Sequence, residues 1–320
     1  MIAVENLRKT FGDKVAVADL SFSLERGQTL ALVGTSGSGK TTTLKMLNRL
    51  IQPTSGRILI DGQDTASLPL AEMRRKMGYV IQQIGLFPHY TVAENIAVVP
   101  QLLQHEKRTI QARSRELLER LSLPSDQYLD RYPHELSGGQ QQRVGIARAL
   151  AASPPVLLMD EPFSALDQIT RQELRRDFRE LEALKNTTTV IVTHDLEEAF
   201  ELADQVCLLD HGELQQLDTP RQLLANPANE FVRTFLGSQQ LRLALQVLTV
   251  ADLALPGSNT KSTDARTATT YSADMRLKEV EEQLLQQASD TLAQTEDGQV
   301  FDLTDINQTA VAFLRQNRQN

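Results

Sequence analysis

The chain contains 320 residues and carries a formal net charge of −8 at pH 7, so one large domain or two unequal domains fit its length. The acidic balance argues against a nucleic-acid partner, because proteins that bind nucleic acids usually present a basic face. No apolar run approaches the roughly 18 residues of a membrane-spanning helix, and the start lacks a basic-then-apolar signal peptide, so we expect the chain to stay in the cytoplasm.

Residues 1–236 alternate short apolar runs with helical patterns, which predicts a parallel sheet with helices packed on it. Some runs are almost entirely aliphatic, as in strands covered on both faces: Leu30–Val33, Gly78–Gln82, Val156–Asp160 and Thr189–Thr193. Earlier segments are more two-faced and predict an antiparallel flank: Ile2–Leu7, Ala16–Leu24 and Gly56–Ile60. The expected fold class is therefore α/β, with a mixed sheet core.

A glycine-rich segment separates the first aliphatic run from a helical stretch at Thr42–Leu50. It fits the pattern Gly-x-x-x-x-Gly-Lys-Thr, in which glycines let backbone N–H groups turn inward around the phosphates of a nucleoside triphosphate. Lys40 can reach the β and γ oxygens, and the Thr41 hydroxyl can ligate Mg²⁺. The candidate phosphate-binding residues are Gly34, Thr35, Ser36, Gly37, Ser38, Gly39, Lys40, Thr41 and Thr42.

Residues 101–152 are rich in helical patterns, with breaks at Pro124 and Pro133. A second candidate anion site opens one of these helices, where Ser137 can cap the helix and glycine N–H groups face outward. It consists of Ser137, Gly138, Gly139 and Gln140. Two phosphate sites in one chain are most simply explained if the second serves a nucleotide held by another copy.

Two acids follow the apolar run Val156–Met159, at the carboxyl end of a predicted strand, where ligands bind in open α/β sheets. Asp160 is placed to hold the shell of a Mg²⁺ ion. Glu161 projects differently and can polarise a water for in-line attack on the γ-phosphorus. A strand that merely ends in solvated acids is the alternative, and it leaves the neighbouring phosphate loop unexplained.

Taken in chain order, these motifs resemble the ATP-binding subunit of an ABC transporter. The resemblance covers about residues 1–236 and is carried by Gly34–Thr41, Leu136–Gln140, Val156–Glu161, Ser164–Asp167 and His194–Asp195. It implies an ABC-type nucleotide-binding domain of the P-loop NTPase class, with a helical subdomain at about residues 84–152. It also implies an ATPase that uses ATP and Mg²⁺ and forms a head-to-tail homodimer, in which each phosphate loop faces the Ser137–Gln140 segment of the other copy.

Further residue roles are implied by the resemblance, position by position. Phe11 matches the aromatic residue that stacks on adenine, and Asp167 matches the residue that communicates between the two nucleotide sites. Gln82 matches the glutamine that senses Mg²⁺, and His194 matches the histidine that contacts the γ-phosphate. The implied catalytic set is Glu161, His194, Lys40 and Gln82, and the implied metal ligands are Thr41, Gln82 and Asp160.

The segment Gln83–Asn95 matches the surface that docks the integral-membrane permease in this family. Phe87, Pro88 and Tyr90 form an apolar patch there, as docking sites often do, although local packing within the helical subdomain is an alternative. The resemblance therefore implies a peripheral protein on the cytoplasmic face of the inner (plasma) membrane.

The stretch Met77–His89 is similar to the importer subfamily for quaternary amines such as glycine betaine, choline and carnitine, and Lys45–Ile51 and Tyr132–Glu135 agree with it. An aromatic cage for such a cation would belong to a separate substrate-binding protein, because the ATPase never touches the cargo. The ATPase of another ABC importer or of an exporter, and a soluble ABC ATPase outside transport, are the alternatives.

After Gly237 the composition changes, which predicts a second region at residues 237–320 with a linker at about 256–272. This tail resembles a degenerate CBS module of α+β type. The segments that carry the likeness are Val250–Leu253, the amphipathic Leu277–Gln286, Asp290–Ala293, Asp297–Val300 and Leu303–Asp305. Only one copy is present, and Asp302 stands where a glycine is usual, so a sensor and a dimerisation or autoinhibitory tail both remain open.

Overall fold

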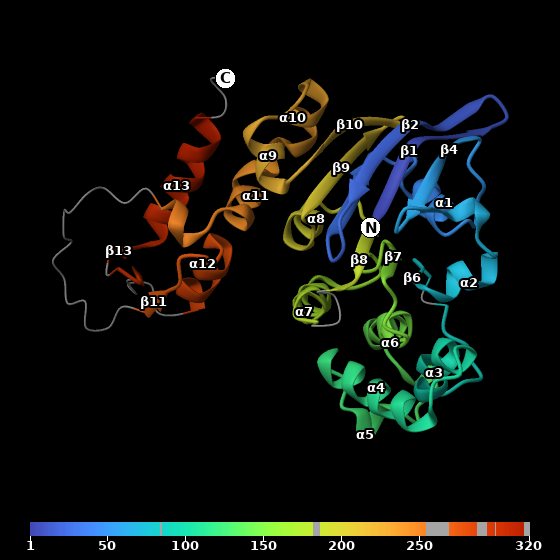
Figure 1. The fold of residues 1–320 in the computed structure, drawn as a ribbon. Coiled ribbons are helices and arrows are strands. Elements are labelled where there is room, and N and C mark those ends of the chain that lie inside the picture. Colours follow the sequence, from blue (N-terminus) through green and yellow to red (C-terminus); the bar gives the residue numbers. More distant parts are fainter. Residues whose placement is uncertain (84, 182–185, 254–268, 287–292, 298, 317–320) are drawn as a thin grey trace. The chain divides into compact units, whose positions relative to one another are not determined.

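The computed structural model describes residues 1–83, 85–181, 186–253, 269–286, 293–297 and 299–316 (Figure 1). The chain divides into two compact units, Met1–Leu217 and Asp218–Asn320. This division falls before the boundary expected after residue 236, which was placed from composition and stays a prediction. Among the described residues, no helix has both the length and the apolar character to cross a membrane.

The larger sheet of the first unit has six strands within the described residues, in the order β10-β9-β3-β8-β7-β6. β3 pairs in parallel with β8 and β9, and β7 pairs in parallel with β6 and β8. The strands are β3 (Thr29–Gly34), β6 (Met77–Val80), β7 (Val156–Asp160), β8 (Thr188–Val192), β9 (Gln205–Asp210) and β10 (Glu213–Asp218). The predicted parallel sheet is therefore present, and β3, β6, β7 and β8 carry the predicted aliphatic runs. β9 and β10 were not predicted as strands.

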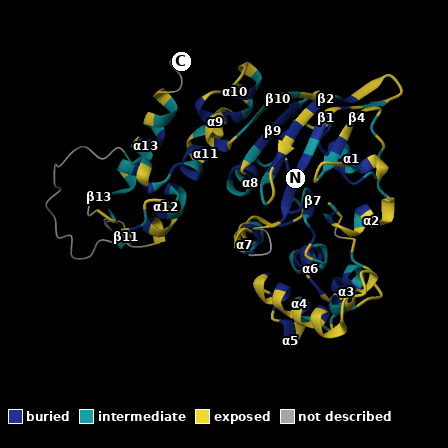
Figure 2. Cartoon of the chain, viewed as in Figure 1, coloured by how far each residue is buried: buried dark blue, intermediate teal, exposed yellow. Residues whose placement is uncertain are grey.

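The side chains of this sheet pack into two separate hydrophobic cores, one on each face. In β7, Val156 and Leu158 belong to one core, whereas Leu157 and Met159 belong to the other. Successive side chains of a strand point to opposite faces, so a strand covered on both faces needs apolar residues at every position. Figure 2 shows β7 as buried, which agrees with this reading.

The smaller sheet of the first unit has the order β2-β1-β4-β5 within the part of the chain that is described. All of its pairings are antiparallel, as predicted. The strands are β1 (Ile2–Phe11), β2 (Lys14–Leu24), β4 (Ser55–Ile60) and β5 (Gln63–Asp64). Val4 and Leu7 pack into the same core as Leu44 of helix α1 (Lys40–Leu47), so this sheet and α1 close one face of the parallel sheet.

Helices of the first unit supply the second core. α3 contacts α4 and α6, and Ile96, Leu117 and Val144 from these helices share one cluster with Leu157 of β7. The helices are α2 (Leu70–Arg75), α3 (Val92–Leu102), α4 (Lys107–Arg120), α5 (Ser125–Tyr128), α6 (Gly138–Leu150), α7 (Gln168–Arg179) and α8 (Leu196–Leu202). Pro124 precedes α5 and Pro133 opens a 3₁₀ turn, which agrees with the predicted breaks.

The second unit is built around a small sheet in the order β11-β12-β13 among its described residues. β11 (Thr269–Tyr271) pairs in parallel with β12 (Ala293–Thr295), which pairs antiparallel with β13 (Val300–Phe301). The accompanying helices are α9 (Pro220–Ala225), α10 (Glu230–Leu236), α11 (Gln240–Val247), α12 (Leu277–Gln286) and α13 (Leu303–Gln316).

The tail agrees with the sequence in part. The amphipathic helix has the predicted bounds, Leu277–Gln286, and two short strands followed by a helix close the unit. The expected linker was drawn too long at its end, because Thr269–Tyr271 forms a strand whose partner lies more than twenty residues further on. Residues 256–268, Asp290 to Leu292 and Gly298 of the predicted segments lie outside the described residues. The likeness to a CBS module stays a prediction.

Candidate active site

In the loop between β3 and α1, two glycines pass so close to neighbouring backbone that no other residue would fit. A Cβ atom on Gly34 would lie 1.9 Å from the carbonyl oxygen of Leu209, and one on Gly39 would lie 2.4 Å from the carbonyl oxygen of Ala16. Gly39 is also the N-cap of α1 with a φ of 99°, a conformation open mainly to glycine. The loop therefore starts and ends in tight contact with neighbouring strands, and α1 begins at Lys40, slightly before the predicted helical stretch.

Lys40, the first residue of α1, turns its side chain back toward this loop and is almost fully buried. Its Nζ donates hydrogen bonds to the carbonyl oxygens of Gly34 at 3.0 Å and Thr35 at 2.7 Å, and lies 3.4 Å from the Ser38 hydroxyl. Burial lowers the pKa of Lys40, while the carboxylates of Glu161 and Asp160 oppose that change. A poorly hydrated cation held by neutral oxygens is well placed to gain from a phosphate.

Asp210 contacts the phosphate loop through Thr35, and it was not predicted from the sequence. The Thr35 hydroxyl donates a 2.6 Å hydrogen bond to the carboxylate of Asp210, which ends β9 beside β3. An acid directly after the buried run Val206–Leu209 was the available signal, and it is the same signal that identified Asp160. Asp210 thus anchors the phosphate loop from the neighbouring strand.

The predicted metal ligands Thr41 and Asp160 lie together. The Thr41 hydroxyl donates a 2.9 Å hydrogen bond to Asp160 Oδ1. Burial raises the pKa of Asp160, and the bond from Thr41 and the charge of Lys45 act against that rise. A cation at this position would relieve the desolvation of the carboxylate, so the donor set favours a hard divalent ion.

Glu161 occupies a strained backbone position directly after β7. Its φ is 46°, which is uncommon for a residue with a side chain, and its N–H is held by the carbonyl oxygen of Val192 at 2.9 Å. Such strain persists where the surroundings over-determine it, often at functional sites. The turn redirects the Glu161 side chain relative to Asp160, as the sequence reading expected for two consecutive acids.

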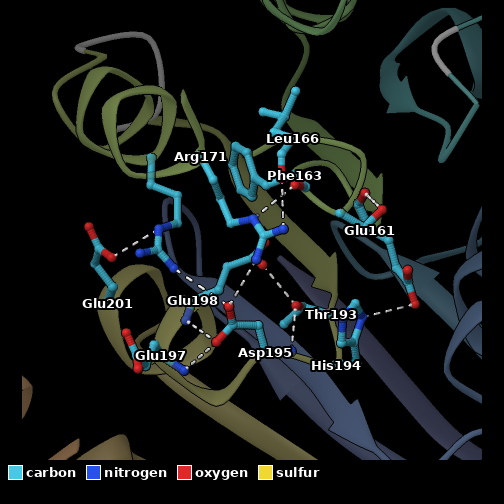
Figure 3. Close-up of polar contacts among 12 residues, drawn as sticks. Glu161, Phe163, Leu166, Arg171, Thr193, His194, Asp195, Glu197, Glu198 and Glu201 are labelled. Atoms are coloured by element: carbon cyan, nitrogen blue, oxygen red, sulfur yellow. Dashed lines mark hydrogen bonds and ion pairs between the residues drawn. The ribbon is translucent and has the colours of Figure 1, made fainter. Parts of the chain in front are cut away.

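The Glu161 carboxylate brings together the remaining members of the predicted catalytic set. Gln82 Nε2 donates a 3.1 Å hydrogen bond to Glu161 Oε2, and His194 Nδ1 lies 3.5 Å from Glu161 Oε1 (Figure 3). The predicted strand ended at Gln82, but β6 ends at Val80. Gln82 therefore lies beyond the end of β6 and is not paired in the sheet. This position lets its side chain extend to Glu161, directly after β7.

The second candidate anion site has the predicted cap. The Ser137 hydroxyl accepts a 3.3 Å hydrogen bond from the N–H of Gln140, and Gln140 Oε1 accepts a 2.9 Å bond from the N–H of Ser137. A Cβ on Gly138 would meet open space, whereas one on Gly139 would lie 2.7 Å from Thr170 Cγ2 of α7. The start of α6 is thus exposed on one side and packed against α7 on the other.

Two further predicted residues, Asp167 and Phe11, lie at the surface, and each contacts a residue close to it in the chain. Asp167 is the N-cap of α7, and hydrogen bonds from Thr170 lower its pKa. The ring of Phe11 is half exposed, and Lys9 Nζ lies 4.8 Å from its centroid. Both residues are accessible at the surface.

Comparisons with known proteins identify the family of this chain. A family model described as ABC transporter matches residues 17–164. The glycine betaine uptake system ATP-binding protein YehX of Escherichia coli is 52% identical over 79% of this chain and 82% of its own length. The glycine betaine/carnitine/choline transport ATP-binding protein OpuCA of Bacillus subtilis is 52% identical over 75% of this chain. That match spans 63% of OpuCA, less than two thirds of the relative's length.

A solved structure of similar fold is the dimeric post-hydrolysis state of the ATP-binding cassette MJ0796 bound to ADP and Pi. It is 33% identical, with a TM-score of 0.61, and the match covers 68% of this chain and 98% of that chain. This chain therefore belongs to the ABC transporter family and carries its ATP-binding domain. The predicted ABC-type fold is confirmed.

Proposed function

We propose that this chain is the ATP-hydrolysing subunit of an ABC importer and that its cargo is a quaternary-amine osmoprotectant such as glycine betaine. The observation that carries the catalytic part is the carboxylate of Glu161, held by Gln82 at 3.1 Å and flanked by His194 at 3.5 Å. This cluster stands at the carboxyl end of β7, one residue beyond the pair of Asp160 and Thr41.

Each residue of the cluster has a distinct task. Glu161 accepts the proton of the attacking water, which is the role of a positioned general base. The Gln82 amide fixes one carboxylate oxygen, which leaves the other to face the water. His194 carries an exposed imidazole beside that second oxygen and donates to the γ-phosphate, whose charge spreads over its outer oxygens in the transition state.

The phosphates are held by the loop that contains Lys40. When ATP binds, the Lys40 ammonium exchanges the carbonyl oxygens of Gly34 and Thr35 for phosphate oxygens, which bind a cation more strongly. Thr41, Asp160 and Gln82 would hold Mg²⁺, which supplies neutralisation of the charge that develops on the β- and γ-phosphates. Phe11 offers a half-exposed π-face for the adenine ring.

A second copy of the chain completes the site in this proposal. The first N–H groups of a helix have no partners within the helix, and those of Gly138 and Gly139 lie at the exposed start of α6. Asp167 and the apolar Ile169, which is 71% exposed, begin the adjoining helix α7. This surface fits an ATP-dependent homodimer, because a phosphate of the partner's nucleotide would pair with those N–H groups.

The permease would dock on the segment Gln83–Asn95, of which Ile84 lies outside the described residues. The rings of Phe87 and Tyr90 are nearly half exposed and lie 5.3 Å apart. Buried Asn95 fixes the backbone that carries them, because its Oδ1 accepts a bond from the N–H of Phe87 and its Nδ2 donates to the carbonyl oxygens of Phe87 and Tyr90. A rigid apolar patch is typical of a docking surface, and it would keep the protein peripheral on the cytoplasmic face of the membrane.

The cargo follows from relatives alone, because no residue of an ATPase needs to touch it. The relatives named for glycine betaine, carnitine or choline reach 52% identity. The sulfate/thiosulfate import ATP-binding protein CysA of Synechococcus elongatus is 46% identical over 74% of this chain. That smaller but substantial likeness keeps another importer as the second candidate, with a separate substrate-binding protein setting the cargo in either case.

Transport by the assembled complex tests the proposal. The chain is purified with the membrane proteins that accompany it, and the complex is reconstituted with its substrate-binding protein in vesicles loaded with ATP and Mg²⁺. Uptake of radiolabelled glycine betaine that disappears in Glu161→Gln supports the proposal. Uptake of sulfate instead would overturn the cargo assignment, and equal ATP hydrolysis by wild type and Glu161→Gln would overturn the catalytic assignment.

A further inference from the structure

Arg171, on the first turns of α7, contacts two separate loops of the site. Its Nε donates a 3.2 Å hydrogen bond to the carbonyl oxygen of Phe163, and its Nη2 donates a 2.9 Å bond to that of Leu166. Its Nη1 lies 3.8 Å from Asp195 Oδ2. Figure 3 shows the guanidinium between the Phe163–Leu166 turn and Asp195.

The turn on one side of Arg171 runs between the proposed base and the dimer surface. It begins at Glu161, whose carbonyl oxygen accepts bonds from the N–H and the hydroxyl of Ser164. It ends at Asp167, the cap of α7. Phe163 within it is fully buried. Because the guanidinium bonds the carbonyl oxygens of Phe163 and Leu166, a shift of this turn is expected to move the guanidinium as well.

The loop on the other side contains His194, whose two neighbours are both fixed. The Thr193 hydroxyl is buried, donates a 2.9 Å bond to Glu198 Oε2, and accepts a 3.0 Å bond from the N–H of Asp195. Asp195 Oδ1 caps α8 through the N–H of Glu197 at 2.9 Å. The His194 side chain itself is 63% exposed and lies against Glu161. Its position therefore depends on the backbone on either side of it.

A second arginine strengthens the same link. Arg175, one turn further along α7 and almost fully buried, has its Nη1 3.9 Å from Asp195 Oδ2 and its Nε 3.2 Å from Glu201 Oε2. Asp195 thus faces two cations from α7. Because a planar guanidinium offers several donors in a fixed fork, Arg171 can hold two carbonyl oxygens and remain beside a carboxylate at the same time.

We propose that Arg171 is a positioning residue for His194, which couples the orientation of the imidazole to the Phe163–Leu166 turn through Asp195. When the turn moves as the dimer surface opens or closes, the guanidinium displaces Asp195, and the backbone of His194 follows. The catalytic role of His194 rests on the proposed function, whereas the mechanical link can be tested without any ATP hydrolysis.

The test compares Arg171→Ala with Arg176→Ala, which removes an exposed arginine from the same helix. The chain has five histidines, and the imidazole NMR signal that is lost in His194→Gln identifies His194. We expect Arg171→Ala to shift or broaden the His194 signal selectively, while Arg176→Ala leaves it in place. We also expect kcat for ATP to fall about ten- to a hundredfold with KM little changed, because Arg171 acts on geometry and not on ATP binding.

Arg171→Lys is the conservative variant. If Arg171→Ala does not fold, Arg171→Lys replaces it in the same measurements. Lysine keeps a positive charge near Asp195 but cannot bond both carbonyl oxygens in the same fork, so we expect it to perturb the His194 signal as well. A His194 signal equal to that of wild type in the folded variant would overturn the inference, even if kcat fell. A wild-type chain that hydrolyses no ATP would instead overturn the proposed function and leave the NMR comparison valid.

Discussion

Arg143 of α6 donates a hydrogen bond to the carboxylate of Asp177 on α7. The same guanidinium donates a 2.8 Å bond to the carbonyl oxygen of Leu121 and lies 3.7 Å from Glu173. Its side chain is only 7% exposed, so one buried cation joins α6, which Ser137 caps, to α7, which Asp167 caps. The two segments proposed for the dimer surface are therefore held as one piece.

Removal of this cation should destabilise the first unit. Arg143→Met leaves the Asp177 carboxylate and the Leu121 carbonyl oxygen without their donor, and breaking a buried pair from one side costs about 3–5 kcal/mol. That corresponds to a fall in melting temperature of about 2–4 °C for each kcal/mol. Thermal unfolding of Arg143→Met beside Arg108→Met, an exposed arginine of α4, measures the difference. Equal melting temperatures would show that the pair contributes nothing.

Glu161→Gln should stop turnover without loss of ATP. Glutamine has the shape of the carboxylate and can still accept the bond from Gln82, but it cannot take a proton from water. The loss of a general base lowers kcat about 10²–10⁴-fold. With Mg²⁺ and ATP, the variant should elute as a stable dimer in size-exclusion chromatography, because the nucleotide that holds the copies together persists.

The control for Glu161→Gln is Glu180→Gln, at the exposed end of α7, which should hydrolyse ATP like wild type. Turnover by Glu161→Gln within threefold of wild type would be incompatible with Glu161 as the base. A variant that is inactive but monomeric with ATP would separate the two ideas, since it would support the base and contradict the dimer.

Much of the site was predictable from the sequence because it depends on local order along the chain. Gly34–Thr41 follows a strand and opens a helix, and Asp160 and Glu161 follow the fully apolar run Val156–Met159. In each case one chain segment carries both the element and its chemistry. Parallel pairing of β3, β8 and β7 then brings the carboxyl ends of these segments to one edge of the sheet.

What the sequence did not reveal depends on contacts between distant segments. The bond between Thr35 and Asp210 spans 175 residues, and the fork of Arg171 requires a turn and a helix to meet in one geometry. Arg171 and Arg175 resemble any solvated helix arginines in the sequence, although Arg175 is buried. Strands β9 and β10 were also missed. Most side chains of β10 are only partly buried and give no strong alternation, whereas the run in β9 is short and was noted only for its cysteine.

Lys40→Met should separate ATP affinity from stability. The buried ammonium is held by neutral oxygens, and burial already lowers its pKa, so its charge contributes little to the stability of the chain without nucleotide. Methionine keeps the aliphatic stem, and we expect an unchanged or slightly higher melting temperature. ATP affinity should fall about tenfold or more, because hydrogen bonds to charged groups contribute about 1.5–3 kcal/mol.

Isothermal titration with ATP and thermal unfolding of the same samples measure both quantities for Lys40→Met. Lys14→Met, at an exposed position of β2, serves as the control and should change neither. Undiminished ATP affinity would contradict the assignment of the phosphate loop. A large fall in melting temperature would instead show that Lys40 stabilises the loop in its own right.

The protonation of Glu198 should make the stability of the chain depend on pH. Burial raises the pKa of this carboxyl to about 8, and the charge of Asp195 adds to the rise, whereas the bond from Thr193 and the charges of Arg175 and Arg171 oppose it. Its Oε1 is buried without a hydrogen-bond partner among the described residues, which suits the neutral acid. The folded chain therefore keeps a proton that the unfolded chain releases above a pKa of 4.5.

Because the folded state binds more protons, stability must fall as pH rises from about 4.5 to about 8. Glu198→Gln removes this dependence, since its amide stays neutral and can still accept the bond from Thr193. We expect the melting temperature of wild type, relative to Glu198→Gln, to decline steadily from pH 5 to pH 8.5. Other titrating groups are common to both proteins and cancel in the difference. A difference that stays constant over this range, or that grows with pH, would mean that Glu198 is ionised in the folded chain.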